Sequence, residues 1–292
     1  MTRRLAALGC VLLLVTAGCA GIGGQDGQTT TAPTQTTTEA TDAAAEAATE
    51  TAEQFAPGVT TEGVEDAKAL ADAHLDLLED DAFVRRARTR MTNESTTATQ
   101  NQTNQFTTDS LWRMSVSGES LPVAFGVTNG TYGVYADSER VLWRLADDET
   151  GNVSFGVEQV TADGESVAIP PAQVFENQVR WIYNHGLVYT LAANADSVEV
   201  VDGSEAVAEL SGSASEAPTR FDRTGDVEFT ATVSENGLVT AIDLTYPSGN
   251  ATVERTITFD TDVVNPVDEP DWYETALNET GLSEAPTSET GE

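Results

Sequence analysis

The chain has 292 residues, and its 48 acidic against 14 basic side chains give a formal net charge of −34. A surface this acidic repels phosphate, which excludes nucleic acid as a partner. The two cysteines, Cys10 and Cys19, lie near the N-terminus, so the rest of the sequence has no residue for a disulfide, a thiol nucleophile or a thiolate metal site.

The N-terminal residues have the order of an export signal. A short basic head precedes the apolar run 5–15, and small residues then lead to Cys19. The run is too short to span a bilayer as a mature helix. A cysteine directly after Ala-Gly resembles a lipobox, which implies a signal peptide over residues 1–18 and a lipid on Cys19. The lipid would hold the mature chain on the outer, extracellular face of the cell membrane. The alternative is an ordinary cleaved signal followed by a chance cysteine.

Residues 19–56 contain few large apolar side chains and include a Thr-rich stretch at 29–38. Such a segment cannot bury enough apolar surface to offset its ordering entropy, so we expect a disordered tether. A single folded domain is then expected over residues 57–278. Residues 279–292 read as a disordered acidic tail.

The first expected element of the domain is a helix that starts at Asp66. Its apolar positions recur every three or four residues, as one helical face requires. His74 lies within this stripe, so we expect it to be a packed and hydrogen-bonded core residue. The stripe consists of Ala67, Leu70, Ala71, His74, Leu77 and Leu78.

The period changes to two after this helix, and residues 83–91 read as a strand. Arg86, Arg88 and Arg90 fall on one of its faces. We expect this row to pair with carboxylates on neighbouring strands, and binding of an anionic headgroup is the alternative.

Further strands are expected from alternating apolar residues, and Asn129-Gly130 is a typical two-residue hairpin turn between strands 123–127 and 132–134. Pro170-Pro171 predicts the start of a second helix, and His185-Gly186 its end. The other strands before this helix are 112–116, 141–145 and 153–157.

Another run of strands should follow the second helix. Asn236-Gly237 and Ser248-Gly249 read as turns within this run. In the last strand Arg255 shares a face with apolar residues, so it must be paired or extend to water. A short terminal helix should begin near 269–272 and dock through Trp272, Tyr273, Ala276 and Leu277. The strands are expected at 187–193, 197–202, 206–210, 227–233, 238–246 and 251–259.

Signatures of catalysis are missing from the sequence, which has no Gly-x-Ser-x-Gly, phosphate-loop or His-Glu-x-x-His motif. The carboxylates between 260 and 271 match no calcium loop. We therefore expect no enzyme, no catalytic residue, no metal and no cofactor. A hydrolase that works through carboxylates remains the alternative, and it would need two facing carboxylates of which one has a raised pKa.

Six Asn-x-Ser/Thr sequences are possible glycosylation sites outside the cell. Asn93 and Asn101 are the best candidates, since both fall in an expected polar loop.

The order of elements predicts an α+β fold. Hairpin turns dominate, and no helix–strand alternation indicates a parallel sheet. We expect a strongly curved antiparallel sheet of about ten strands, a half-barrel, packed against two or three helices.

A family resemblance joins several of these features. The abundance of Asp, Glu and Thr with one lysine resembles secreted proteins of salt-loving archaea. The lipobox, the Thr-rich tether, Ala56-Pro57-Gly58-Val59, Leu70…Ala73-His74…Leu77 and Pro270-x-Trp272 together resemble a family of haloarchaeal surface lipoproteins. More distantly, the element order is similar to lipoprotein-carrier and mycobacterial lipid-binding lipoproteins. That similarity implies a half-barrel that holds acyl chains under helical lids, and it transfers no residue.

The expected function is that of a lipid-anchored, non-catalytic module that binds a lipid or another hydrophobic molecule. Trp112, Trp143 and Arg255 are the candidate ligand contacts. The alternative is a structural or interaction protein of the cell envelope with a closed core, because apolar sheet faces always pack on something.

Overall fold

The computed structural model describes residues 53–119, 127–162, 165–201, 207–219 and 222–282. The expected signal peptide, Cys19, most of the tether, most of the strand at 123–127 and most of the acidic tail lie outside these ranges. Within the described part of the chain, no helix combines the length and the apolar character needed to cross a membrane.

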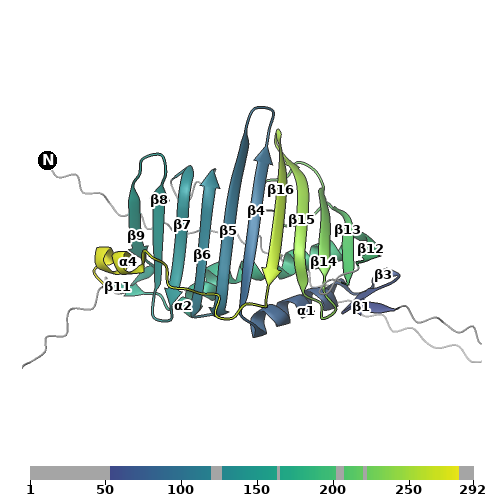
Figure 1. Ribbon diagram of the computed structural model, residues 1–292, viewed down its shortest axis with the longest axis horizontal. Coiled ribbons are helices and arrows are strands. Elements are labelled where there is room, and N and C mark those ends of the chain that lie inside the picture. Colours follow the sequence, from purple (N-terminus) through teal and green to yellow (C-terminus); the bar gives the residue numbers. More distant parts are fainter. Residues whose placement is uncertain (1–52, 120–126, 163–164, 202–206, 220–221, 283–292) are drawn as a thin grey trace, which may run out of the picture. The chain divides into compact units, whose positions relative to one another are not determined.

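The fold is built on an open, curved antiparallel sheet of eleven strands, which confirms the predicted α+β class (Figure 1). The spatial order is β12-β13-β14-β15-β16-β4-β5-β6-β7-β8-β9, so strands from the two halves of the chain meet where β16 pairs with β4. The strands are β4 (Phe83–Thr92), β5 (Thr97–Thr108), β6 (Leu111–Glu119), β7 (Asn129–Asp137), β8 (Val141–Asp147), β9 (Val153–Val157), β12 (Ala195–Val200), β13 (Ala208–Ala214), β14 (Val227–Val233), β15 (Val239–Ser248) and β16 (Ala251–Asp260).

Two smaller sheets accompany the large one. A three-stranded sheet precedes the first helix, and its first strand lies within the range expected to be tether. A separate hairpin follows β9. These strands are β1 (Gln54–Ala56), β2 (Val59–Thr60), β3 (Gly63–Val64), β10 (Gln159–Ala162) and β11 (Glu165–Ala168).

The first helix, α1 (Ala67–Asp80), is confirmed together with its apolar stripe. Asp66 caps its N-terminus, since the Oδ1 atom accepts hydrogen bonds from the backbone N–H groups of Lys68 at 3.0 Å and Ala69 at 2.9 Å. Leu70, Ala71, His74 and Leu78 are its buried residues.

The second helical region differs from the prediction. It consists of α2 (Pro171–Val174), the π-helical turn η2 (Phe175–Val179), the 3₁₀ turn η3 (Arg180–Tyr183) and α3 (His185–Ala193). The break is at Asn184, whose φ of +58° is left-handed, and His185 begins α3 instead of ending a helix. Asparagine takes this conformation more easily than most residues, so it replaces glycine as the terminator.

The predicted strand at 187–193 is wrong, because these residues form α3. Leu187, Val188 and Leu191 bury one side of a helix, at a spacing that no single strand face provides. A short apolar run of this kind is ambiguous by periodicity alone.

Asn129-Gly130 is not a hairpin turn. The two residues begin β7 and pair with Glu119 and Gly118 of β6. The other two predicted turns are confirmed, with left-handed φ values of +94° at Gly237 and +60° at Gly249.

Strand β5 takes the place of the expected polar loop. Asn93 lies in the tight turn between β4 and β5, where its Oδ1 atom accepts hydrogen bonds from the backbone of Ser95 at 3.0 Å and Thr96 at 2.9 Å. Asn101 lies within β5 and is exposed. The strand has no apolar alternation, because Gln100 and Gln102 occupy the positions where apolar residues would be expected.

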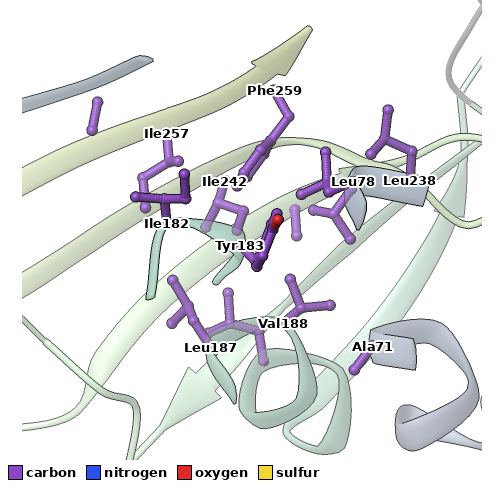
Figure 2. Packing of buried hydrophobic residues seen from close by; sticks show 14 of the residues in the cluster. Ala71, Leu78, Ile182, Tyr183, Leu187, Val188, Leu238, Ile242, Ile257 and Phe259 are labelled. Atoms are coloured by element: carbon purple, nitrogen blue, oxygen red, sulfur yellow. The ribbon is translucent and has the colours of Figure 1, made fainter. Parts of the chain in front are cut away.

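Helix α1 and the α2–α3 region pack on one face of the sheet, which we call the inner face. Val253, Arg255, Ile257 and Phe259 of β16 belong to it and are buried. Figure 2 shows Ile182, Leu187 and Val188 of the helical region against Ile242, Ile257 and Phe259 of the sheet. At the neighbouring strands, an aromatic cluster fills the core between helices and sheet. The ring centroids are 5.3 Å apart for Phe83 and Phe106 and 4.9 Å apart for Phe106 and Phe175. Those of Phe175 and Tyr183 are 5.9 Å apart.

The terminal helix α4 (Tyr273–Thr280) is confirmed, but it covers the opposite, outer face. Ala276 and Leu277 pack on Leu142 in a cluster separate from the main core. Leu142 neighbours Val141, which packs into the main core, and successive strand residues point to opposite faces. The three helical regions therefore do not share one face of the sheet.

Candidate ligand-binding face

Polar side chains are buried on the inner face of the three central strands. They belong to β16, β4 and β5, and each is at most 9% exposed. We call this set the inner polar cluster: Arg85, Thr89, Gln100, Gln102, Asn104 and Arg255. Buried polar groups are costly without partners, so six on one sheet face form a specific feature and not a generic core.

One end of the cluster holds the helical region to the sheet. Arg85 Nε donates to Asn184 Oδ1 at 2.8 Å, and Arg85 Nη1 donates to Asn104 Oδ1 at 3.3 Å. The guanidinium also lies 5.4 Å from the centre of the Trp181 ring. The left-handed residue that ends η3 is thus tied to the sheet by a charge-assisted hydrogen bond.

An apolar patch lies beside the cluster on β6, β7 and β8. Its four side chains, Met114, Tyr132, Trp143 and Leu145, are only partly buried, whereas Val116 and Val134 between them are buried. Gln102 Nε2 lies 3.7 Å from Met114 Sδ, so the patch and the polar cluster touch.

Trp143 is held flat against the sheet by a glycine. A Cβ atom at Gly156, its cross-strand partner, would lie 2.2 Å from the Trp143 ring. Only glycine therefore permits this ring position, and the wall of the patch is preformed.

Among the described helices, α1 and the α2–α3 region cross the inner face at one level of the strands. In Figure 1, β4 to β7 extend well beyond the level at which α1 and the α2–α3 region cross the sheet. The aromatic cluster marks the covered level, because Phe83, Phe106 and Trp112 are cross-strand neighbours. Met114, Gln102 and Gln100 lie farther along the strands.

The three predicted ligand contacts all point to the inner face, but they do not meet. Trp112 is 1% exposed, donates from Nε1 to the Asp109 carbonyl at 3.1 Å and packs near Phe175. Trp143 belongs to the apolar patch, and Arg255 belongs to the polar cluster. From the register, Arg255 and Trp112 are three strands and six residues apart, which is roughly 25 Å.

Two surface hollows lie elsewhere. One, of about 700 Å³, is lined by Ser234, Glu235, Asn236, Leu238, Thr240, Phe259, Asp260, Thr261 and Asp262. The other, of about 270 Å³, lies on the outer face of β4, β5 and β16. Neither is lined by Trp112, Trp143 or Arg255.

His74 is a buried core residue, as predicted. Its Nε2 atom lies 2.9 Å from the Tyr183 carbonyl, and its Nδ1 atom accepts the Val239 N–H at 3.2 Å. These partners require a neutral ring with its proton on Nε2. Burial lowers the pKa of His74 to about 4.

Among the described carboxyl groups, Glu158 is the one whose pKa is clearly raised. Burial raises the pKa of Glu158, and no neighbouring charge contributes to that rise. In the described ranges, no three His, Cys, Asp or Glu side chains gather as metal ligands would.

Two members of the arginine row of β4, Arg86 and Arg90, pair with carboxylates of the adjacent strand as predicted, whereas Arg88 has no ion pair among the described residues. Arg86 Nη1 lies 3.5 Å from Asp260 Oδ2, and Arg90 Nη1 lies 3.7 Å from Glu254 Oε2.

Sequence reasoning missed most of the inner polar cluster. The sequence signal for it is that the amide residues Gln100, Gln102 and Asn104 recur at every second position, which places them on one face of a strand. It was missed because a strand was expected to show apolar residues at that period.

No protein-family profile matches this chain, and no curated protein sequence does. Solved structures match at the level of the fold, with low similarity. LprF from Mycobacterium bovis is 10% identical, with 69% of this chain and 96% of that chain covered and a TM-score of 0.36. LppX, a lipoprotein from Mycobacterium tuberculosis, is 11% identical over 68% and 97% of the two chains, with a TM-score of 0.30. A putative outer membrane lipoprotein-sorting protein domain from Vibrio parahaemolyticus is 8% identical over 72% and 99%, with a TM-score of 0.25.

Proposed function

We propose that the chain is a non-catalytic binding module that holds a lipid or another hydrophobic molecule with a polar end on the inner face of its sheet. The observation that carries this proposal is the contact between the partly buried apolar patch and the buried polar cluster. An amphiphile needs both surfaces side by side, whereas a closed core needs neither.

In this proposal the apolar patch binds the apolar part of the ligand, and the inner polar cluster binds its polar end. The apolar body would lie on Trp143, Tyr132 and Leu145, while Met114 adapts its flexible thioether to the ligand shape. The polar end would lie toward Arg255 and the amides of β5. Trp112 would contribute from beneath, as part of the packed floor.

The same proposal includes the cellular setting. A lipid on Cys19 would anchor the domain to the outer face of the membrane, and the tether would separate the two. Glycosylation remains a proposal for Asn93 and Asn101, of which Asn101 is exposed on a strand.

The binding test uses the Cys19→Ser chain, so that no covalent lipid interferes, and a fluorescent C16 fatty acid as the probe. Leu145→Glu places a carboxylate in the apolar patch. We expect it to weaken binding at least about tenfold, because the ligand would lose apolar contact worth roughly 1.4 kcal/mol. Val160→Glu adds the same charge at a residue that is 47% exposed on the β10–β11 hairpin, and it should leave binding unchanged.

The opposite result would favour the second hypothesis of a ligand-free envelope protein. If the unmodified patch binds no fatty acid, and organic extracts of the purified chain contain no stoichiometric lipid, the proposed function is wrong. Equal effects of Leu145→Glu and Val160→Glu would also contradict it, since the probe would then bind elsewhere.

A further inference from the structure

A shallow groove of about 270 Å³ lies on the outer face of the sheet, on the side opposite to the inner polar cluster. Side chains of three neighbouring strands line it in two cross-strand rows. One row is Thr103, Arg86 and Thr258, and the other is Asn101, Arg88 and Thr256.

The two arginines stand in the centre of this arrangement. They are two residues apart on β4, so their Cα atoms are about 7 Å apart. Each has an uncharged hydrogen-bonding side chain opposite it on both adjacent strands. The groove therefore combines two cations with three hydroxyl groups and one amide.

Carboxylates flank the groove but leave its centre open. Arg86 has Asp260 at 3.5 Å, and the next cation along the strand, Arg90, has Glu254 at 3.7 Å. The Arg88 side chain has no ion pair or hydrogen bond among the residues that the structure describes, and the Thr256 hydroxyl donates to Asp243 Oδ1 at 2.5 Å. A charge-complementary sheet would place a carboxylate opposite Arg88, as it does for Arg90.

This arrangement is unusual for a chain with a net charge of −34. With 48 acidic residues available, the two positions that face Arg88 are nevertheless Asn101 and Thr256. A bound anion would supply the charge that these positions lack.

We propose that the groove binds a sulfate or phosphate ester carried on a sugar. The guanidinium groups of Arg88 and Arg86 match the oxygens of a tetrahedral anion. The hydroxyls of Thr103 and Thr258 and the unglycosylated Asn101 amide can donate to and accept from sugar hydroxyls. The Thr256 hydroxyl, which donates to Asp243, can only accept. Ala87 is the one apolar residue of the lining, so the groove offers little to the acyl chains of a phospholipid.

The test measures binding of a sulfated hexasaccharide to the full chain by calorimetry, at the lowest salt in which the protein unfolds cooperatively. The unsulfated hexasaccharide should not bind. Arg88→Gln should weaken binding of the sulfated form at least tenfold, with no change in the thermal unfolding curve. Arg90→Gln is the matched control: it removes one positive charge from the same strand outside the groove, and it should change binding less than twofold.

Several results would overturn the proposal. One is that the sulfated hexasaccharide does not bind. Another is that Arg90→Gln weakens its binding as much as Arg88→Gln does, which would indicate general electrostatic attraction. Binding of phosphatidylglycerol vesicles without binding of the saccharide would indicate a membrane contact instead. Displacement by inorganic sulfate at equal concentration would show that the sugar contributes nothing.

Discussion

His74 connects three elements of the core through its two ring nitrogens. Its own helix α1 is joined to the end of η3 through the Tyr183 carbonyl and to β15 through the Val239 N–H. The ring also packs edge-on against Phe259, with centroids 4.8 Å apart. A protonated ring could not accept the Val239 N–H, so the neutral form is the structural one.

We predict that His74 makes the protein less stable as the pH falls from about 6.5 to about 4. Its pKa is about 4 in the folded state, against 6.5 for an unperturbed histidine, so the unfolded chain takes up the proton first. The stability that depends on neutral His74 is complete above pH 6.5 and is lost toward pH 4, by roughly 3 kcal/mol.

The measurement is urea unfolding of the wild-type chain and of His74→Gln at several pH values in 2 M KCl. His74→Gln should be less stable at pH 7.5, and the difference between the two proteins should shrink as the pH falls. Since both proteins share all other titrating groups, their difference isolates His74. A difference that stays constant from pH 7.5 to pH 4.5 would contradict this.

At the scale of elements, α4 is attached to the sheet independently of the other helices. Its contacts are Leu277 and Ala276 on Leu142, Trp272 over Gly133, and a hydrogen bond from Tyr273 Oη to Asp137 Oδ2 at 2.6 Å. Burial, with the neighbouring Asp137 carboxylate, raises the pKa of Tyr273.

We expect Leu277→Ala to release α4 without unfolding the domain. Hydrogen exchange should accelerate at 273–280 and at β9, which α4 contacts, while β14 to β16 remain protected. Leu70→Ala is the matched control, because the same truncation in the main core should lower global stability by about 2–5 kcal/mol. Uniform acceleration in both variants would show that α4 belongs to the main cooperative unit.

The helical region from α2 to α3 depends on a contact distant in sequence. Asn184 breaks the region with a left-handed backbone, and Arg85 of β4 binds its side chain. The sequence indicated a break near this point but placed it at Gly186. The left-handed conformation costs asparagine a small amount of free energy, so we attribute the choice of Asn184 over Gly186 to the tertiary hydrogen bond with Arg85.

At the scale of the whole molecule, the dominant feature is the net charge of −34. Mutual repulsion of the carboxylates opposes the compact state in dilute buffer, and salt shortens the range of that repulsion.

We therefore predict that the melting temperature rises by more than about 5 °C between 0.1 M and 2 M KCl at pH 7.5. The control is pH, because the charge vanishes near the sequence pI of about 4.1 and the salt effect should shrink there. Thermal unfolding followed by circular dichroism at both KCl concentrations and both pH values measures this change in melting temperature. An equal salt effect at both pH values would mean that salt acts by a route other than charge screening.

The sequence by itself determined the elements whose signals are local. Helix α1 with its Asp66 cap, strand β14, the turns at Gly237 and Gly249, and the arginine face of β4 all follow from periodicity and turn chemistry, which depend on neighbouring residues. The tertiary structure decided that 187–193 is a helix, that α4 covers the outer face, and that β5 is a central strand. These depend on distant contacts: Gln100 and Asn104 are polar in any local window, and only β4, β6 and the helices turn them into a buried cluster beside the candidate binding face.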